Sequence, residues 1–367
     1  MFNRLFTFFS ICVLLISCTN SNDDFYKSDR LEKNIEIKKV DEFTLHSADD
    51  SEKLIGNLRF SFASNPAGSL HAFYDEIKKQ FLITDNKGEI QEVIGDEGRG
   101  PKEIVGVEGY NFNNKNQLVV YDNTQLMIKV YDLDGEILSH AKPEQSSYPI
   151  SGSKLHTYDG NLVSGTMDRR LLGNLKDQAY KSKLAAVHNY DGQLLDTIGT
   201  YDPSLRKPTS YNLFPIVTVD KKSGHLISTH YHNYRIQVYD LATEQREAWF
   251  GRKTEGFTTG EEYVSMNLPR HKIKEKTVGR SSAVSIHTVP NYIVLYFETI
   301  TEAFYETGNS NKKKSYLAVY NDESYDSYGD VRLPYVLGNV SNGKFYLIEN
   351  DNPSNYTVGI YEFNKKN

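Results

Sequence analysis

Two histidines separated by one residue are the first side chains in this sequence that could bind a metal. His230 and His232 flank Tyr231, and on an extended strand both imidazoles would point to the same side. A zinc site needs three or four protein ligands, and no Asp or Glu at a suitable spacing completes this pair. We therefore expect hydrogen-bonding surface histidines, keep both as candidate ligand-binding residues, and predict no metal and no cofactor.

A glycine-rich run offers a second kind of chemistry, because exposed backbone amides can bind an anion. The run reads DEGRGP and spans Asp96–Pro101. No helical pattern follows it, which favours a tight crossing between structural repeats. The chain carries no P-loop, nucleophile elbow, metalloprotease helix motif or EF-hand loop. We predict no catalytic residue, and the sequence leans against an enzyme without deciding the question.

The N-terminus predicts export from the cytoplasm. Arg4 precedes an apolar run from Leu5 to Ile16, and Ser17 and Cys18 follow. A basic start before about 7–15 apolar residues is typical of a secretory signal peptide. The ending Leu-Ile-Ser-Cys resembles the bacterial lipobox, whose cysteine is acylated. We therefore predict that Cys18 is the lipid-attachment site.

This interpretation divides the chain into three parts. Residues 1–17 are the predicted lipoprotein signal peptide, residues 18–33 a polar tether and residues 34–367 the folded body. Acyl chains hold such a body on a membrane because each buried CH₂ contributes about 0.8 kcal/mol. The membrane, reached through this lipid, is the first predicted partner. The predicted location is the cell envelope, at the outer membrane, with the periplasmic and surface sides both open.

Composition narrows the class of fold and of partner. The chain has 42 Lys and Arg against 48 Asp and Glu, a net charge of −6. This balance argues against a nucleic-acid partner, because proteins that bind nucleic acid carry basic surfaces. The 26 Tyr and 18 Phe favour half-buried strands. Both cysteines lie within the first 18 residues, so no disulfide framework is expected in the body.

One pattern recurs six times along the body. An apolar alternating run ends in Tyr-Asp or a relative of it, and a short polar turn leads to a second alternating run. Alternation of period two broken by Asp-Gly or Asn/Asp turns is the signature of a β-hairpin. Further strands precede each copy, and units of four strands are typical of propeller blades. The copies are Phe81–Gly95, Ile128–Leu138, Leu184–Gly199, Tyr234–Gly251, Ser315–Gly329 and Thr357–Asn364.

The strand count predicts how the ring closes. The sixth unit lacks its fourth strand when the chain ends, and an alternating strand before the first unit has no partner of its own. An open seam would expose sheet edges. We predict an all-β fold, a six-bladed β-propeller with four-stranded blades, in which Ile35–Glu42 pairs with Thr357–Asn364. Two stacked β-sandwich domains are the alternative, although no Pro-, Gly- or Ser-rich linker divides the chain.

The first blades also resemble a known family. The segment of about residues 34–140, including Gly98-Arg99-Gly100-Pro101-Lys102-Glu103, is similar to the six-bladed, NHL/TolB-like propeller lipoproteins of Bacteroidota. That family carries Gly-x-Gly-Pro-Gly-Glu after its first blade, and Lys102 departs from the pattern. The resemblance implies the fold and an envelope location. It says little of function, because propellers host many functions.

Long segments and positive charge gather at one end of the predicted ring. Connections between strands 2 and 3 of a blade, and between blades, lie at the same end, which we call the loop face. The long segments all fall in these connections, and with Gly95–Glu103 they carry a net charge of +8, leaving −14 for the rest. Long loops on a rigid scaffold often carry function. The long segments are Arg169–Lys183, Thr200–Phe214, Arg252–Arg280 and Thr301–Lys314.

We therefore predict an envelope lipoprotein, non-catalytic, whose loop face binds a protein, peptide or glycan. The charge favours an anionic peptide or glycan, because the guanidinium group of Arg forms forked hydrogen bonds with carboxylate or phosphate. Two alternatives stay open: a metal-dependent enzyme resembling the calcium-dependent lactonases, and a glycan-binding module built on tyrosines. The candidate ligand-binding residues are Arg169, Arg170, His230, His232, Arg252, Arg270 and Arg280.

Overall fold

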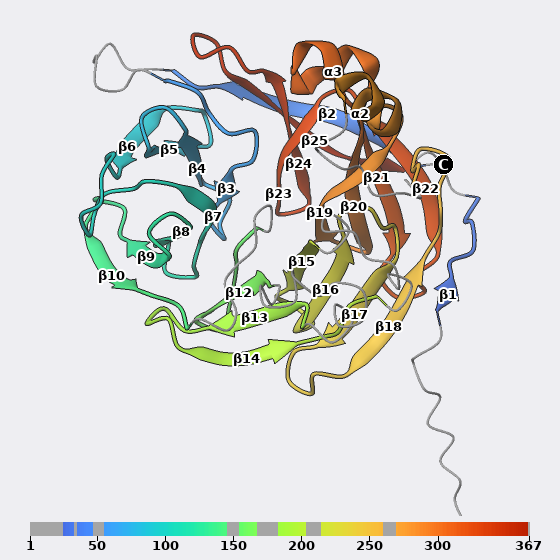
Figure 1. The fold of residues 1–367 in the computed structure, drawn as a ribbon, viewed down its shortest axis with the longest axis horizontal. Coiled ribbons are helices and arrows are strands. Elements are labelled where there is room, and N and C mark those ends of the chain that lie inside the picture. The colour runs from blue at the N-terminus through green and yellow to red at the C-terminus, as the bar shows by residue number, and fades with distance from the viewer. Residues whose placement is uncertain are drawn as a thin grey trace, which may run out of the picture.

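The protein is a six-bladed β-propeller, as the sequence predicts. Its computed structural model describes residues 25–32, 35–46, 55–144, 154–166, 183–202, 214–259 and 269–365. Six sheets stand around a common centre (Figure 1), and each contains the four antiparallel strands of one blade. The first strand of each blade is innermost, since β7 contacts both β3 and β11 around the ring.

The strands of the first three blades follow one another along the chain. Blade 1 consists of β3 (Ala63–Ser64), β4 (Leu70–Asp75), β5 (Gln80–Asp85) and β6 (Ile90–Ile94). Blade 2 consists of β7 (Val107–Phe112), β8 (Leu118–Asp122), β9 (Met127–Tyr131) and β10 (Ile137–Ala141). Blade 3 consists of β11 (His156–Tyr158), β12 (Asn161–Gly165), β13 (Ala185–His188) and β14 (Leu194–Ile198).

The last three blades keep the same order until the seam. Blade 4 consists of β15 (Pro215–Asp220), β16 (His225–His230), β17 (Ile236–Asp240) and β18 (Arg246–Gly251). Blade 5 consists of β19 (Ser281–Val289), β20 (Tyr292–Thr299), β21 (Lys314–Asn321) and β22 (Ser327–Leu333). Blade 6 consists of β23 (Val336–Ser341), β24 (Lys344–Asn350), β25 (Thr357–Lys365) and β2 (Ile35–Thr44).

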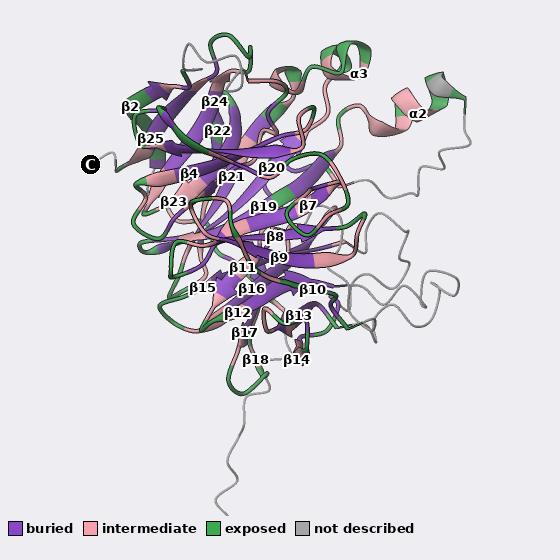
Figure 2. Ribbon diagram, turned by 90° about the vertical axis from the view of Figure 1, so that its left-hand side faces the viewer, coloured by how far each residue is buried: buried purple, intermediate pink, exposed green. Residues whose placement is uncertain are grey.

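The core lies between neighbouring blades. The two middle strands of a blade are buried on both faces, so their residues are apolar in both alternating positions, and Figure 2 shows this burial through the ring. Between blades 1 and 2, for example, the rings of Phe81 and Tyr110 lie 4.8 Å apart. Fully burying each such side chain contributes about 1.5–3 kcal/mol. The outer strands are more exposed, because they lie at the rim of the ring.

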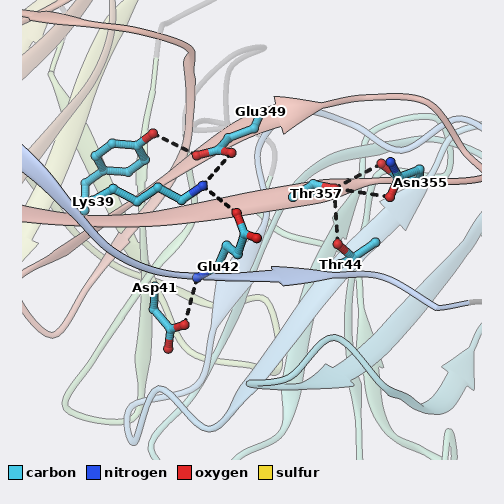
Figure 3. A network of polar contacts seen from close by, with 8 residues as sticks. Lys39, Asp41, Glu42, Thr44, Glu349, Asn355 and Thr357 are labelled. Atoms are coloured by element: carbon cyan, nitrogen blue, oxygen red, sulfur yellow. Dashed lines mark hydrogen bonds and ion pairs between the residues drawn. The ribbon is translucent and has the colours of Figure 1, made fainter.

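The N-terminal strand β2 closes the ring, as the number of strands in the sequence predicts. β2 pairs antiparallel with β25 along its whole length, from Ile35 opposite Lys365 to Thr44 opposite Thr357. Figure 3 shows the polar contacts at this seam: the Lys39 ammonium lies 2.8 Å from the Glu349 carboxylate on β24, and the hydroxyls of Thr44 and Thr357 lie 3.2 Å apart. The predicted closure is confirmed.

A short strand that the sequence did not predict lies outside blade 4. β1 (Tyr26–Lys27) pairs parallel with β18, so this sheet has five strands. The chain then crosses to blade 5, where the Leu31 amide donates to the Ser327 carbonyl at 2.8 Å. We call residues 25–31 the strap, because they connect the rims of blades 4 and 5 before β2 enters blade 6.

The recurrent Tyr-Asp element has a structural role. At the ends of β4 and β8, Asp75 and Asp122 are fully buried, and each accepts backbone amides from its own turn and from the segment that enters its blade. At the opposite end of the ring, Asp85 and Asp132 accept two amides each in the turns between strands 3 and 4. Asp and Asn suit such positions because their short side chains reach nearby amides.

The predicted loop-face connections also hold short helices. α2 (Arg270–Thr277) precedes blade 5, while α3 (Glu302–Thr307) and the 3₁₀ turn η4 (Ser310–Lys312) join β20 to β21. The Thr301 hydroxyl caps α3 by accepting the Phe304 amide. Among the described residues, no helix is long and apolar enough to cross a membrane.

Candidate functional site

A cavity of about 780 Å³ opens on the loop face at the centre of the ring. Its walls come from blades 1, 2, 3 and 5, so it forms the mouth of the central channel. We call it the channel-mouth cavity. It is lined by Arg59, Ser61, Phe62, Tyr74, Glu76, Lys79, Gly106, Val107, Glu108, Gly109, Tyr110, Asn123, Lys154 and Val284.

Blade connections place these side chains at the mouth. Arg59 precedes β3, Glu76 lies in the turn between β4 and β5, and Lys154 precedes β11. Each of these positions lies at the loop-face end, because the first strand of a blade starts there and strands 2 and 3 are joined there. Val284 reaches the cavity from an irregular point of β19, where the register with β20 shifts.

The acidic groups of the cavity are already paired. The Arg59 guanidinium lies 3.0 Å from the Glu76 carboxylate and stacks over the ring of Tyr74 at 5.2 Å. The Asn123 amide donates to the Glu108 carboxylate at 2.7 Å. Buried Tyr110 donates its hydroxyl to the Ser61 carbonyl at 2.6 Å. These contacts fix the walls around blades 1 and 2.

Lys154, on the opposite wall, has no such partner. Among the described residues, no carboxylate lies within ion-pair distance of its ammonium group. Burial alone lowers the pKa of Lys154 to about 8. The side chain is nevertheless half-exposed, because it borders the cavity rather than the packed core.

Two imidazoles lie near Lys154 on the innermost strands. Burial, followed by Lys154 and Lys221, lowers the pKa of His156 on β11 to about 3. Burial, Lys154 and His156 lower the pKa of His287 on β19 well below its usual value. Because β11 and β19 belong to blades 3 and 5, these interactions run across the channel. Both histidines are therefore neutral at pH 7, and the charge of this group resides on Lys154.

Sequence reasoning missed this group although its pattern is visible. Lys154, His156 and Tyr158 alternate with buried Leu155 and Thr157, so period-two alternation places them on one side of the innermost strand. The basic and imidazole side chains that actually occupy the channel follow from the same alternation.

The predicted histidine pair does not line this cavity, and its two side chains lie in different surroundings. His230 is the last residue of β16 and is fully buried, whereas His232 lies in the following turn and its ring is 3.0 Å from the Ser281 carbonyl. The expectation of a surface residue is wrong for His230, because β16 is a middle strand covered on both faces. Neither ring nitrogen of His230 has a hydrogen-bond partner in the described part of the chain.

The predicted arginines do not meet at the channel-mouth cavity in the described residues. Arg252 is half-buried and donates to the Ser28 carbonyl at 3.1 Å, so it holds the strap. Arg280 precedes β19, and Arg270 is the first residue of α2. Cys18, Arg169 and Arg170 lie outside the described residues, and their predicted roles stay predictions.

Part of the predicted positive charge is neutralised on the loop face itself. The Lys274 ammonium on α2 lies 2.6 Å from the Glu302 carboxylate and 3.0 Å from the Glu306 carboxylate on α3. The segment Arg252–Arg280 therefore contributes less positive electrostatic potential to the loop face than its net charge indicates. These exposed pairs stabilise the protein little, but they reduce the charge that a partner would meet.

The glycine-rich run is a tight crossing, as the sequence favours. The Glu103 carboxylate accepts the Gly100 amide at 2.6 Å, and a side chain at Gly98 would collide with the same carboxylate. Buried Lys129 donates to the Glu103 carbonyl. The anion position that the glycines offer is thus filled by the chain's own Glu103.

One group among the described residues has the composition of a metal site. Ligand atoms of His225, Asp240 and Glu247 lie within 4.8 Å of one another, at the end of blade 4 that faces away from the loop face. His225 already lies 2.9 Å from the Glu247 carboxylate, and one oxygen of Asp240 accepts the amides of Ala242 and Thr243. The contacts of this group therefore fit a turn-stabilising cluster.

Buried histidines predict an acid-sensitive fold. Burial lowers the pKa of His71, His188 and His230 to about 4, against about 6.5 in the unfolded chain. Their contribution to stability is therefore present above pH 6.5 and is lost as the pH falls toward 4. Each titrating histidine lowers the free energy of unfolding by up to about 1.4 kcal/mol per pH unit.

Urea unfolding at pH 7, 6 and 5 measures this loss. We expect His230→Phe to be less sensitive to acid than the wild type, because it removes a buried site that must be protonated. His140→Gln, which changes an exposed histidine on β10, is the matched control and should keep the wild-type slope. Equal slopes for all three proteins would contradict the prediction.

Comparisons with known proteins agree with the fold. No protein-family model matches the sequence, and no curated protein matches it. The structure is similar to that of a DUF4221 family member from Bacteroides vulgatus, with a TM-score of 0.68 and 14% identity over 91% of this chain and 99% of that one. It is also similar to a Bacteroides fragilis protein named as exported, with a TM-score of 0.56 and 13% identity over 94% and 99%.

Identities this low carry an argument about architecture alone. The NHL/TolB-like resemblance of the first blades stays a prediction, since no family model matches. The chain is a six-bladed β-propeller whose structural neighbours include the DUF4221 protein of Bacteroides vulgatus and the Bacteroides fragilis protein.

Proposed function

We propose that this protein is a lipid-anchored protein of the cell envelope that binds a partner at its loop face, in the channel-mouth cavity. The observation that carries the proposal is the cavity itself: about 780 Å³, open on the face that bears the long connections, and lined by residues from four blades, of which three supply polar groups. Ligand sites are typically concave cavities of this size with a few fixed polar groups.

The envelope location rests on the N-terminus and on one neighbour. The apolar run before Cys18 has the pattern of a lipoprotein signal, and a structural neighbour from Bacteroides fragilis is named as exported. The strap leaves the N-terminal end of the described chain at the rim of blade 4.

Binding fits the cavity better than catalysis does. A calcium-dependent lactonase requires carboxylates that converge on one ion, whereas Glu76 and Glu108 are paired with Arg59 and Asn123. The other described cations of the lining are Lys79 and Lys154, and the imidazoles of His156 and His287 near Lys154 are neutral at pH 7. The glycan-binding alternative based on tyrosines loses support, because Tyr74 and Tyr110 in the cavity are buried and offer no open ring face.

An obstructing side chain tests the proposal. Val284 is 36% exposed at the cavity, so Val284→Trp should fill part of the mouth without entering the core. Leu138→Trp is the matched control, since Leu138 is 50% exposed on the outer strand β10. Full-length protein in detergent is applied to an array of bacterial envelope glycans and of peptides.

We expect array members that bind the wild type and Leu138→Trp and that bind Val284→Trp at least tenfold more weakly. Circular dichroism checks that both variants keep the propeller. The absence of any array member that binds the wild type, or binding that Val284→Trp leaves unchanged, would contradict the proposal.

A further inference from the structure

We propose that the channel-mouth cavity selects a ligand that carries one carboxylate group, with Lys154 as the charge that recognises it. This inference rests on the proposed function and specifies the chemistry of its ligand. It uses a residue that neither the motifs nor the candidate arginines indicated.

The net charge of the cavity lining indicates how many negative charges a ligand should carry. Among the described residues, its lining holds three cations, Arg59, Lys79 and Lys154, and two carboxylates, Glu76 and Glu108. Arg59 pairs with Glu76 at 3.0 Å, and the Glu108 carboxylate accepts the Asn123 amide at 2.7 Å. The lining therefore has a net charge of about +1, which one carboxylate balances and which a doubly charged phosphate would exceed.

The position of Lys154 makes it the cation that such a group would meet. The acidic side chains lie on the walls formed by blades 1 and 2, and Lys154 lies at the start of blade 3. No carboxylate in the described part of the chain neutralises this half-buried ammonium, which is costly because the cavity gives it less solvation than water does. A ligand carboxylate would remove this cost and would form a charge-assisted hydrogen bond.

The groups that lie below Lys154 in the channel also favour an anionic ligand, because none of them is an acid that would pair with the Lys154 ammonium. His156 on β11 and His287 on β19 interact with Lys154 and are neutral at pH 7. Lys221, whose ammonium lies 3.4 Å from the Thr157 hydroxyl, adds positive charge on the far side of His156. No carboxylate contributes to the pKa of these four groups in the described structure.

The proposal has a signature in pH. Burial lowers the pKa of Lys154 to about 8, so the free protein loses this charge as the pH rises through 8. The groups facing it from the other elements are Arg59, Glu76, Lys79 and Glu108 around the cavity and His156 and His287 below it. Burial holds the pKa of both histidines well below the usual value of about 6.5, at about 3 for His156, so both stay neutral between pH 7 and 9. Selectivity for a carboxylate should therefore fall between pH 7 and 9.5.

Pairs of acidic and neutral probes test the inference on the full-length protein in detergent. The probes are glucuronate against glucose, and N-acetylalanine against its amide, with affinities measured by ligand-observed NMR at low salt. The two pairs distinguish an acidic sugar from a peptide carboxylate as the source of the group. We expect at least one acid to bind tenfold more tightly than its neutral partner at pH 7, and this preference to fall at pH 9.5.

Three variants assign the preference to Lys154. Lys154→Met should weaken the acid at least tenfold and leave the neutral probe unchanged, whereas Lys154→Arg should keep the preference, including at pH 9.5. Lys115→Met makes the same change of charge at an exposed turn on the opposite face and should behave like the wild type. The inference is overturned if neither acid binds, if acid and neutral probes bind equally, or if Lys154→Met keeps the preference.

The two proposals fail separately. If the array members that bind the wild type but not Val284→Trp are neutral, binding in the cavity would be supported and its selectivity for a carboxylate would be overturned. In the converse case, the array members still bind Val284→Trp, and Lys154→Met removes the preference for an acid. That result would support the carboxylate site at Lys154 and would overturn the proposal that a partner binds in the cavity on the loop face.

Discussion

A form of the protein that begins at residue 45 will lose its sixth blade, whereas a form that begins at residue 34 will fold. Both lack residues 1–33, which include the strap, so they differ only in the residues that include β2. Removing β2 deletes nine paired positions along β25 and leaves that strand as an open edge. Exposed edge strands template association with other chains, so the shorter form should also aggregate.

Side chains make this loss larger than that of backbone pairing alone. Phe43 is 4% exposed and packs in the cluster between blades 1 and 6, and Ile35 packs in the cluster between blades 5 and 6. Lys39 connects β2 to Glu349 on β24 (Figure 3). The shorter form thus loses two apolar anchors, of about 1.5–3 kcal/mol each, and one partly buried ion pair.

Hydrogen exchange locates the damage. In the form that begins at residue 45, amides of β24 and β25 should exchange faster than those of β8 and β9 by a hundredfold or more. A synthetic peptide of residues 34–44 should restore their protection, which keeps the test informative if the shorter form is poorly soluble. Equal protection of both blades in the shorter form would refute the closure as a source of stability.

The second large effect is expected at Asp75, where Asp75→Ala should lower the free energy of unfolding by about 3 kcal/mol or more. Asp75 is fully buried, and its carboxylate accepts four backbone amides, from Gly56, Asn57, Ile77 and Lys78, at 2.6–3.2 Å. Hydrogen bonds to a charged group contribute about 1.5–3 kcal/mol each, and donors left unsatisfied add a desolvation cost.

Asp85→Ala is the matched control for Asp75→Ala. Asp85 ends the next strand of the same blade, but it is half-exposed and accepts the amides of Lys87 and Glu89 in an open turn, where water can replace it. We expect a loss of about 1 kcal/mol or less. Urea unfolding of both variants measures the difference, and equal losses would show that the buried contacts of Asp75 are not the cause.

Asp75 also connects stability to the site. Its neighbour Glu76 lines the channel-mouth cavity, and two of the four amides that Asp75 accepts, those of Gly56 and Asn57, belong to the segment leading to Arg59. A weakened Asp75 would release both members of the Arg59–Glu76 pair. We therefore expect Asp75→Ala to lose affinity for any cavity ligand, while Asp85→Ala keeps it.

Much of this architecture is encoded locally and is readable from the sequence. Alternation fixes the strands, the Tyr-Asp element fixes the turns, and the missing fourth strand of the last unit leaves β2 as its partner. β1 escaped prediction because it has two residues and pairs parallel with β18, so it carries no alternation. Its place depends on contacts such as the ring of Phe25 against Trp249 at 5.2 Å, which only the folded ring provides.

The site was less predictable because it depends on closure of the ring. Lys154 and Val284 are 130 residues apart in the chain, and only the ring brings them to one cavity. His230 has the same polar side chain as His232, but its strand is covered on both faces by neighbouring blades. Charge sums over whole segments also failed to anticipate pairing across segments, such as that of Lys274 with Glu302.

The strap determines how the molecule bears mechanical load. A pull on the N-terminus first meets β1, where Tyr26 and Lys27 pair with β18, and then Leu31, held on blade 5 by Ser327. Tyr26 adds a 2.5 Å hydrogen bond to Asp326, and Arg252 clamps the carbonyl of Ser28. Tension applied at this end is thus spread over the rims of two blades before it reaches β2. The strand that seals the ring is thereby shielded from a force that acts on the N-terminus.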